Sequence, residues 1–508
     1  MSGAKRFLRA THLAGVSLIV TACAVGPDYV APTRQVPASF SEAPANTPAA
    51  KGTQAHDNGT QAHDNGTQAH EIDDAWWKIL RDPVLEGLIE KALASAPSIT
   101  EAQARVREAR ALTGVAGADR YPTVDAVGQY ARQLGSEHVP IGVPPGGLGQ
   151  GAHSNLWQAG FDASWEMDVF GSQRRTVEAA DANYQAVSED RADVVLTLLA
   201  EVARNYVELR GAQRRNEVAR ENLAIEQDLQ KLTESLLAAG LAPQQDLLRA
   251  QAQVSDIEAA IPQFETDERT AAYRIAALIG QPSREIVAEL SVPRPIPRAV
   301  SEVPVGLPSE LLERRPDVRA AERRIAAANA RIGVAKADLY PHFSLNAVTG
   351  LESLYFTSFS SASSGYYQIG PGITWRIFDA GRIRFQVRAE SARTDAAVAA
   401  YQRSVLEAFR DVETALVSYA NAKIRSNHLA AESSADQQAT EIATLLYKRG
   451  VESFLPVLDA ERSLYAAEDA LATSERDSSL ALIALYKSLG GGWATVSPEL
   501  STNDATKH

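Results

Sequence analysis

Apolar and polar residues alternate in four short stretches of the chain. In one of them, Trp157, Phe161 and Trp165 share one register, while the positions between them include Gln158 and Asp162. Period-two alternation directs apolar side chains to one face of a strand and polar side chains to the other. The pattern predicts strands at about 123–133, 156–169, 343–350 and 366–377.

Long segments without helix breakers follow the strands. Residues 382–449 contain neither Gly nor Pro, and residues 172–239 contain only Gly211. A helix of this length would reach about 100 Å at 1.5 Å per residue, far beyond an ordinary globular helix. We predict long helices at about 172–239, 244–279, 382–449 and 454–489. Ordinary helix breaks without Gly or Pro, or an isolated coiled coil, are the alternatives that the pattern leaves open.

The chain contains one structural unit twice. Residues 97–122 align with residues 316–341, nearly half of the aligned positions are identical, and both blocks end in Tyr-Pro. Further along, Trp165 corresponds to Trp375. The predicted organisation is a first repeat at 72–280, a Pro-rich belt segment at 281–308, a second repeat at 309–490 and a C-terminal tail at 491–508.

Strand length and number together predict a membrane channel made of several chains. A tilted membrane-spanning β-strand needs about 9–11 residues, and bacterial outer-membrane barrels have at least about eight strands. Four strands cannot close such a barrel, and open edges in hydrocarbon leave backbone groups unpaired. Two chains would leave little lumen, whereas three chains give twelve strands and an open one. The predicted fold class is a mixed α and β membrane protein, in which strands from several chains form a barrel and the long helices continue it as a tube into the periplasm. A soluble sandwich would also alternate, and it remains the alternative.

The N-terminus has the pattern of an export signal followed by an acylation site. Three basic residues among the first nine precede an apolar stretch at 13–20, and the only cysteine, Cys23, follows two small residues. This arrangement resembles the bacterial lipoprotein box. It predicts a signal peptide at 1–22 and a Cys23 that carries N-palmitoyl and S-diacylglycerol groups. A plain secretory signal is the alternative.

Residues 23–71 are predicted to form a lipidated, low-complexity tether. A seven-residue unit repeats there and brings in His56, His63 and His70. Such histidines can suggest metal binding. Identical tandem copies are more typical of a recent duplication in a tolerant tether, so we predict no metal site.

Composition excludes several other classes of function. The 63 acidic and 50 basic residues give a net charge of −13, which lacks the basic footprint of a nucleic-acid binder. A single cysteine excludes a disulfide framework within one chain. Gly147, Gly149 and Gly151 are spaced like a dinucleotide fingerprint, but no helical pattern follows them. We therefore predict neither an enzyme nor a cofactor beyond the lipid groups.

Several local motifs identify a family. They are Trp76-Trp77, the segment 164–171 with the sequence SWEMDVFG, the segment 378–382 with the sequence FDAGR, and the segment 457–460 with the sequence VLDA. With the lipoprotein box, they resemble the TolC-like outer membrane factor family, in its lipoprotein branch of the OprM and NodT type. The resemblance covers roughly residues 23–490. It implies a homotrimer whose twelve-stranded outer-membrane β-barrel, with four strands from each chain, continues into a long periplasmic α-helical barrel. It also implies a belt of helical segments around the tube.

The resemblance also implies a function. Members of this branch are outer-membrane exit ducts of tripartite multidrug efflux pumps, with a periplasmic adaptor and a proton-driven inner-membrane transporter of the RND type as partners. The expected cargo is antibiotics and other small toxic compounds, and the expected place is the outer membrane, lipid-anchored and extending into the periplasm. A duct of the same fold for metal-ion efflux or type I protein secretion is the alternative. A non-conducting structural envelope lipoprotein is the alternative from a different class.

Two helix turns are the candidate functional sites. The resemblance implies that Gly240, Leu241, Gly450 and Val451 form periplasmic tips that contact the adaptor. It also implies that Asp246, Tyr447 and Asp459 tie adjacent coils together or narrow the aperture. Arg249 joins these candidates because it is the first-repeat position equivalent to Asp459. Glu452 and Pro456 depart from residues found in some relatives, so the ion-pair network at the aperture stays open. Glycine turns without a binding role and a solvated Asp459 are the alternatives.

Overall fold

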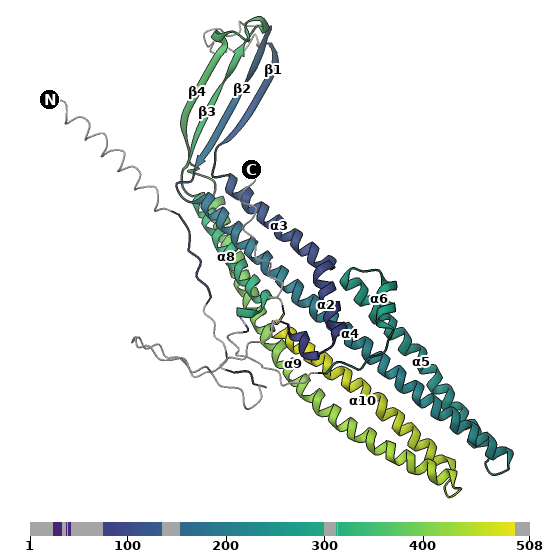
Figure 1. Ribbon diagram of the computed structural model, residues 1–508. Coiled ribbons are helices and arrows are strands. Elements are labelled where there is room, and N and C mark those ends of the chain that lie inside the picture. Colours follow the sequence, from purple (N-terminus) through teal and green to yellow (C-terminus); the bar gives the residue numbers. More distant parts are fainter. Residues whose placement is uncertain are drawn as a thin grey trace, which may run out of the picture. The chain divides into compact units, whose positions relative to one another are not determined.

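The computed structural model describes residues 24–32, 37, 39–41, 75–134, 153–298, 311 and 313–492. The predicted signal peptide, Cys23, the histidine repeat, the Gly147–Gly151 loop and residues 493–508 lie outside the described residues. The chain divides into two compact units, which are described separately below (Figure 1). The first comprises 1–32, 107–186 and 321–400, and the second comprises 33–106, 187–320 and 401–508.

The first unit contains one antiparallel sheet in the order β1-β2-β3-β4. Its strands are β1 Thr123–Leu134, β2 His153–Met167, β3 His342–Ser353 and β4 Gly365–Thr374. The register pairs Tyr130 with Trp157 and Trp165 with Leu345, so apolar residues adjoin apolar residues. On the other face Asp125 pairs with Asp162. The sheet therefore has one apolar and one polar face, as the alternation predicts.

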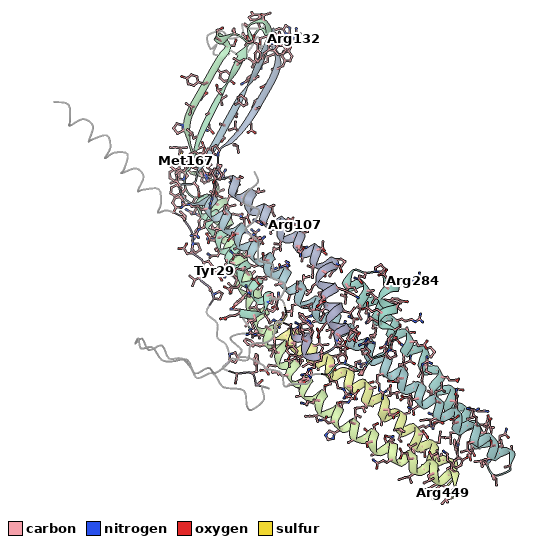
Figure 2. The ribbon with its side chains drawn as sticks, viewed as in Figure 1. Tyr29, Arg107, Arg132, Met167, Arg284 and Arg449 are labelled. Carbon is pink, nitrogen blue, oxygen red and sulfur yellow. The ribbon has the colours of Figure 1, made fainter. Side chains whose placement is uncertain are left out.

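The strand ends differ from the sequence prediction. β4 ends at Thr374 rather than at 377, which leaves Trp375 beyond the strand. The indole N–H of Trp375 donates to the Leu339 carbonyl oxygen at 3.1 Å, a contact outside the strand ladder. β2 begins at His153 rather than at 156 and ends at Met167 rather than at 169, where Figure 2 labels it. β3 continues to Ser353, beyond the expected end at 350.

Two glycines allow β2 and β3 to approach closely. Gly160 pairs with Gly350, and a Cβ on Gly160 would lie 2.4 Å from the carbonyl oxygen of Thr349. A Cβ on Gly350 would lie 2.5 Å from the carbonyl oxygen of Ala159. No side chain fits at either position without a backbone shift. This pair joins the strand from the first repeat to the strand from the second.

Both long helices that follow the strands begin at an aspartate cap. α4 spans Ser172–Ala238 and α9 spans Arg382–Lys448, each 67 residues without a break. Asp168 accepts hydrogen bonds from the backbone N–H groups of Gln173 and Arg174, and Asp379 accepts one from Ile383. Side-chain oxygens at this position satisfy the otherwise unpaired first N–H groups of a helix. In the first unit these helices accompany α3, Pro97–Ala118, and α8, Pro316–Ala337.

The second unit holds most of the buried core. Its further helices are η1 Trp76–Leu80, α2 Pro83–Ser95, α5 Gln244–Ile279, α6 Ser283–Leu290 and α10 Phe454–Ser488. The Trp76 ring stacks on Tyr486 at 5.5 Å between centroids. The buried Arg210 guanidinium donates to the carbonyl oxygens of Leu290 and Val292, which ties the segment after α6 to α4. No helix in the described part of the chain is long and apolar enough to cross a membrane.

Candidate functional site

The two predicted tips are built in the same way. Gly240 follows α4 with φ of 74°, and Gly450 follows α9 with φ of 71°. The Leu241 N–H donates to Leu236 O at 2.8 Å, and the Val451 N–H donates to Leu446 O at 3.0 Å. This six-to-one bond after a left-handed residue is the Schellman ending of a helix. A Cβ at either position would meet nothing within 4 Å, so lack of space is not the reason for glycine. The reason is the left-handed backbone, which glycine adopts without steric cost.

Each tip presents an apolar side chain to solvent. Leu241 is 76% exposed and Val451 is 68% exposed, and Figure 2 labels Arg449 just before the second turn. Rigidly capped turns with exposed apolar side chains form two protrusions of the same geometry.

The structure brings together only some of the predicted aperture residues. An Arg249 guanidinium nitrogen lies 3.9 Å from an Asp246 carboxylate oxygen, with Asp246 14% and Arg249 37% exposed by side chain. This pair lies within the first turns of α5. Asp459 is exposed on α10 and makes no ion pair with any described residue of the chain. The predicted residues therefore do not form one network within a single chain.

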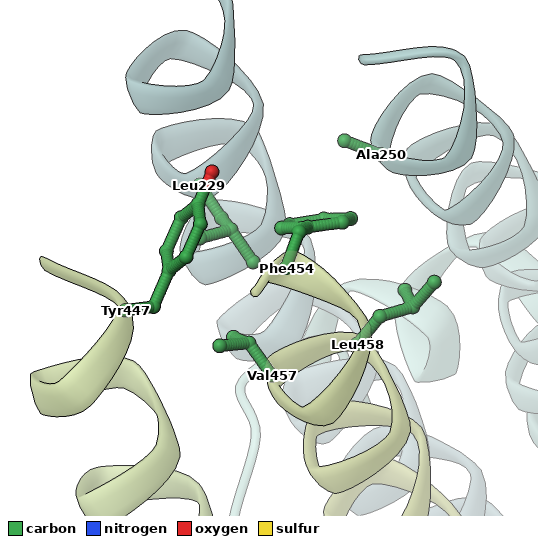
Figure 3. Close-up of a cluster of buried hydrophobic side chains, with 6 residues drawn as sticks. All are labelled: Leu229, Ala250, Tyr447, Phe454, Val457 and Leu458. Atoms are coloured by element: carbon green, nitrogen blue, oxygen red, sulfur yellow. The ribbon is translucent and has the colours of Figure 1, made fainter. Parts of the chain in front are cut away.

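Tyr447 belongs to a buried apolar cluster instead. Figure 3 shows its ring beside Phe454, with ring centroids 5.6 Å apart, next to Leu229. The cluster also contains Ala250, Val457 and Leu458. Its members come from α4, α5, α9 and α10, so it fastens both helical hairpins to each other just before their turns. The Tyr447 hydroxyl is buried and has no hydrogen-bond partner among the described residues.

In the first unit, the residues after Cys23 form a strap, defined here as residues 24–29, that lies against α4 and α8. The Val25 N–H donates to the Phe170 carbonyl oxygen at 3.0 Å. A Cβ on Gly26 would lie 2.5 Å from the Cα of Gly333 in α8. Two glycines therefore permit backbone-to-backbone contact at this point.

Three polar contacts fix the rest of the strap. Asn329 donates to the Pro27 carbonyl oxygen at 2.9 Å, and Arg175 pairs with Asp28 at 2.6 Å. The Tyr29 hydroxyl, labelled in Figure 2, donates to Glu322 at 3.1 Å. The strap therefore joins α4 of the first repeat to α8 of the second. It also starts at the position that directly follows the predicted acylation site.

The sequence prediction did not include the strap contacts or the apolar cluster at the tips. Leu229, Phe454 and Val457 carry a detectable signal, because they lie at the three- and four-residue spacing of a helix seam. The Gly26–Gly333 approach has no local signal, since 307 positions separate the two residues. Among the described residues, no group of three or more His, Cys, Asp or Glu side chains is placed to hold a metal ion.

The sequence has well-matched relatives among known proteins. The pyoverdine export outer membrane protein OpmQ of Pseudomonas aeruginosa is 33% identical over 436 residues, which cover 84% of this chain and 90% of OpmQ. The outer membrane protein OprJ of the same species is 30% identical, with 94% and 95% covered. The antibiotic efflux pump outer membrane protein ArpC of Pseudomonas putida is 30% identical, with 95% of each chain covered.

The fold also matches solved structures of outer-membrane channels. The outer-membrane channel OprN superposes with a TM-score of 0.82 at 36% identity, covering 93% of this chain and all of that one. CusC superposes with a TM-score of 0.76 at 27% identity, covering 92% and 100%. The mixed architecture of a four-stranded sheet with long helices is thus that of the trimeric TolC-like channels, as predicted.

A family model described as "Outer membrane efflux protein" matches residues 88–281 and 307–491. Members of the family are outer-membrane efflux channels and not enzymes. The sequence, the fold and the relatives agree: the chain belongs to the outer membrane efflux protein family.

Proposed function

We propose that this chain assembles as a homotrimer and forms the exit duct of a tripartite efflux pump. Three sheets of four strands make a twelve-stranded barrel, and the long helices continue it as a periplasmic tunnel. A periplasmic adaptor and a proton-driven inner-membrane transporter of the RND type complete the pump. The duct itself is passive, and it carries antibiotics and other small toxic compounds.

The observation that carries this proposal is the open sheet. β1 and β4 each pair on one side only, and their apolar residues lie exposed, with Ile369 66% and Tyr367 82% accessible. Unpaired strand edges are stable in a membrane only if other strands complete them. Further copies of the same chain supply these strands because β4 of one copy presents an edge to β1 of the next.

The names of the relatives favour small-molecule cargo and supply a second candidate. ArpC is named for antibiotic efflux, whereas OpmQ is named for export of pyoverdine. Both names describe relatives about equally similar to this chain. Export of pyoverdine or a similar compound is therefore the second candidate cargo.

The outer end of the duct is lipid-anchored through Cys23 in this proposal. The strap starts directly after Cys23 and contacts Phe170 and Gly171, between β2 and α4. That position suits an acyl anchor in the adjoining leaflet, since β2 is one of the strands assigned to the barrel. Two or more acyl chains give stable anchoring, whereas one chain is marginal.

The inner end is the adaptor-binding end and the aperture. Leu241 and Val451, on the turns at Gly240 and Gly450, contact the adaptor. The packing of Tyr447 keeps the hairpins together, while Asp246, Arg249 and Asp459 surround the opening. In a trimer each of these charges appears three times around the axis.

The test uses the purified trimer in a planar bilayer. Asp246→Ala combined with Asp459→Ala should raise the resting single-channel conductance, because both substitutions remove charges from the narrow end. Asp256→Ala, an exposed aspartate further along α5, is the control and should leave conductance unchanged. A correctly trimeric double variant with unchanged conductance contradicts the aperture assignment.

A deletion strain tests the cargo. Loss of the gene should increase intracellular accumulation of antibiotics, and the intact gene should restore efflux. Accumulation of pyoverdine or a similar compound with unchanged antibiotic sensitivity would support the second candidate. A chain that inserts as a non-conducting trimer would contradict both.

A further inference from the structure

A coiled-coil seam between α4 and α10 contains acidic side chains. On α4 the seam positions are Ala219, Asn222, Glu226, Leu229 and Thr233, all buried. On α10 they are Phe454, Val457, Glu461, Leu464 and Glu468. Both series follow the alternating three- and four-residue spacing of knobs-into-holes packing, which normally takes apolar residues.

The contacts along this seam set its antiparallel register. Arg215 on α4 pairs with Asp469 on α10 at 2.7 Å, and Asn222 donates to Glu468 at 2.8 Å. As the α4 residue number rises, the α10 partner number falls. The next layer toward the tips therefore places Glu226 opposite Glu461.

Neither carboxyl group in this layer forms an ion pair with a basic side chain among the described residues. Glu226 is 2% exposed and Glu461 is 4% exposed, and the Glu226 Oε2 atom is buried without a hydrogen-bond partner. Arg462 on α10 is directed elsewhere, since its Nε donates to Gln253 of α5 at 2.7 Å. Two ionised carboxylates that are buried in one layer and act on each other repel, and they lack water to screen them.

The surrounding charges do not cancel the effect of burial. Burial first, and then the Glu461 carboxylate, raise the pKa of Glu226 to about 7, although Arg462 opposes them. Burial and Glu468 also raise the pKa of Glu461, against Lys448 of α9. The charged groups acting on the layer are thus Arg462 and Glu468 on α10 and Lys448 on α9, and no charged residue of α5 is among them.

A carboxyl whose pKa is raised on folding favours the folded seam on the acid side. Its favourable contribution to the free energy of unfolding is complete below the ordinary carboxyl pKa. That contribution declines as pH rises through the raised pKa. For Glu226 the decline runs from about 4.5 to about 7. The seam is therefore tightest in mildly acidic surroundings and weakest above neutrality.

We propose that Glu226 and Glu461 form a proton-operated latch between α4 and α10. With a shared proton, one carboxyl donates to the other and the seam closes. Without it, the two carboxylates repel and the seam loosens beside Leu229 and Val457, which belong to the apolar cluster next to the tips. The latch regulates how firmly the two hairpins are fastened together.

Hydrogen exchange on the full-length trimer tests the latch. Glu226→Gln and Glu461→Gln keep the side-chain shape and remove the charge. At pH 8, amides of residues 222–233 and 454–464 should exchange about tenfold more slowly in either variant than in the wild type, a factor that corresponds to one pKa unit. At pH 5 the variants and the wild type should exchange alike. Comparison at the same pH cancels the intrinsic pH dependence of exchange.

Glu234→Gln is the matched control, because Glu234 is exposed on the same helix. It should not change exchange at either pH. If the ratio of the exchange rate in the variant to that in the wild type is equal at pH 5 and pH 8, the latch is overturned and only a packing role is left.

A second measurement does not need a variant to fold. Infrared spectra of the wild-type trimer should show a protonated carboxyl band at pH 6 that is lost by pH 8.5. Absence of that band also overturns the latch. Neither measurement depends on cargo, adaptor or pump. A result that overturns the latch can therefore be told apart from a result that overturns the proposed function.

Discussion

The indole N–H of Trp165 donates a hydrogen bond to the carbonyl oxygen of Arg120 across 2.9 Å. The same contact recurs between Trp375 and Leu339 at 3.1 Å. These are the positions that the internal alignment equates. In each repeat the contact joins the turn after the first helical segment to a tryptophan at or just past the end of the second strand.

The first prediction concerns the acylation site. Cys23→Ser should abolish labelling of the protein by a radioactive or clickable palmitate precursor, because it removes the only thiol in the chain. The trimer should still form, since the barrel strands provide a second hold on the membrane. Labelling that persists in the variant contradicts the assignment of Cys23.

The second prediction concerns the tip turns. Gly240→Ala and Gly450→Ala place a Cβ in the left-handed region, at a cost of about 1–2 kcal/mol each. The distorted turns should bind the adaptor more weakly in a surface-plasmon-resonance assay. Gly87→Ala is the control, because Gly87 lies inside α2 with open space around it and the change should stabilise by about 1 kcal/mol. Adaptor binding equal to that of the wild type would show that the turns do not contact it.

The third prediction separates the ring of Tyr447 from its hydroxyl. Tyr447→Phe should leave stability unchanged or slightly higher, because the buried hydroxyl has no hydrogen-bond partner among the residues that the structure describes. Tyr447→Ala should cost about 3–5 kcal/mol, because it leaves a cavity in the apolar cluster. Denaturant unfolding of the trimer and single-channel recordings measure both effects. A Phe variant as unstable or as leaky as the Ala variant would mean that the hydroxyl bonds a neighbouring chain.

The fourth prediction concerns the strap. Gly333→Ala places a Cβ 2.8 Å from Arg175 Cγ and 3.0 Å from the Val25 carbonyl oxygen. Overpacking of this kind costs about 1–3 kcal/mol, so protease cleavage before residue 41 should become about tenfold faster. Gly117→Ala in α3 meets nothing within 4 Å and should leave the cleavage rate unchanged. Equal cleavage rates in both variants would show that the strap does not depend on the Gly26–Gly333 contact.

Local periodicity carries most of the fold. Alternation in segments such as Trp157–Trp165 predicts β2, and the absence of Gly and Pro from 382–449 predicts α9. The family motifs then predict the assembly. The predicted end of β4 was wrong because its partner strand β3 begins at His342, which pairs with Thr374, so the ladder stops there although the alternation continues.

The site was less predictable because it depends on contacts between distant segments. Gly240 and Gly450 are visible as breaks between long helices, and the structure finds turns there. Glu226 and Asn222 read as residues of a solvated helix face, since polar side chains at seam positions interrupt the apolar pattern. Only the packing of α10 against α4 reveals that they are buried.

Gly160 and Gly350 approach each other at the junction of β2 with β3, where a strand of the first repeat meets a strand of the second. In the trimer, the junction of β2 with β3 inside a chain corresponds to the junction of β4 with β1 between chains. An ancestor with a single repeat would need six copies to close the same ring. Tethering two repeats by residues 281–308 replaces half of those encounters with a covalent connection, which raises the effective concentration of one edge for the other. The ring then closes from three bodies, and only three of its six junctions have to form between separate molecules.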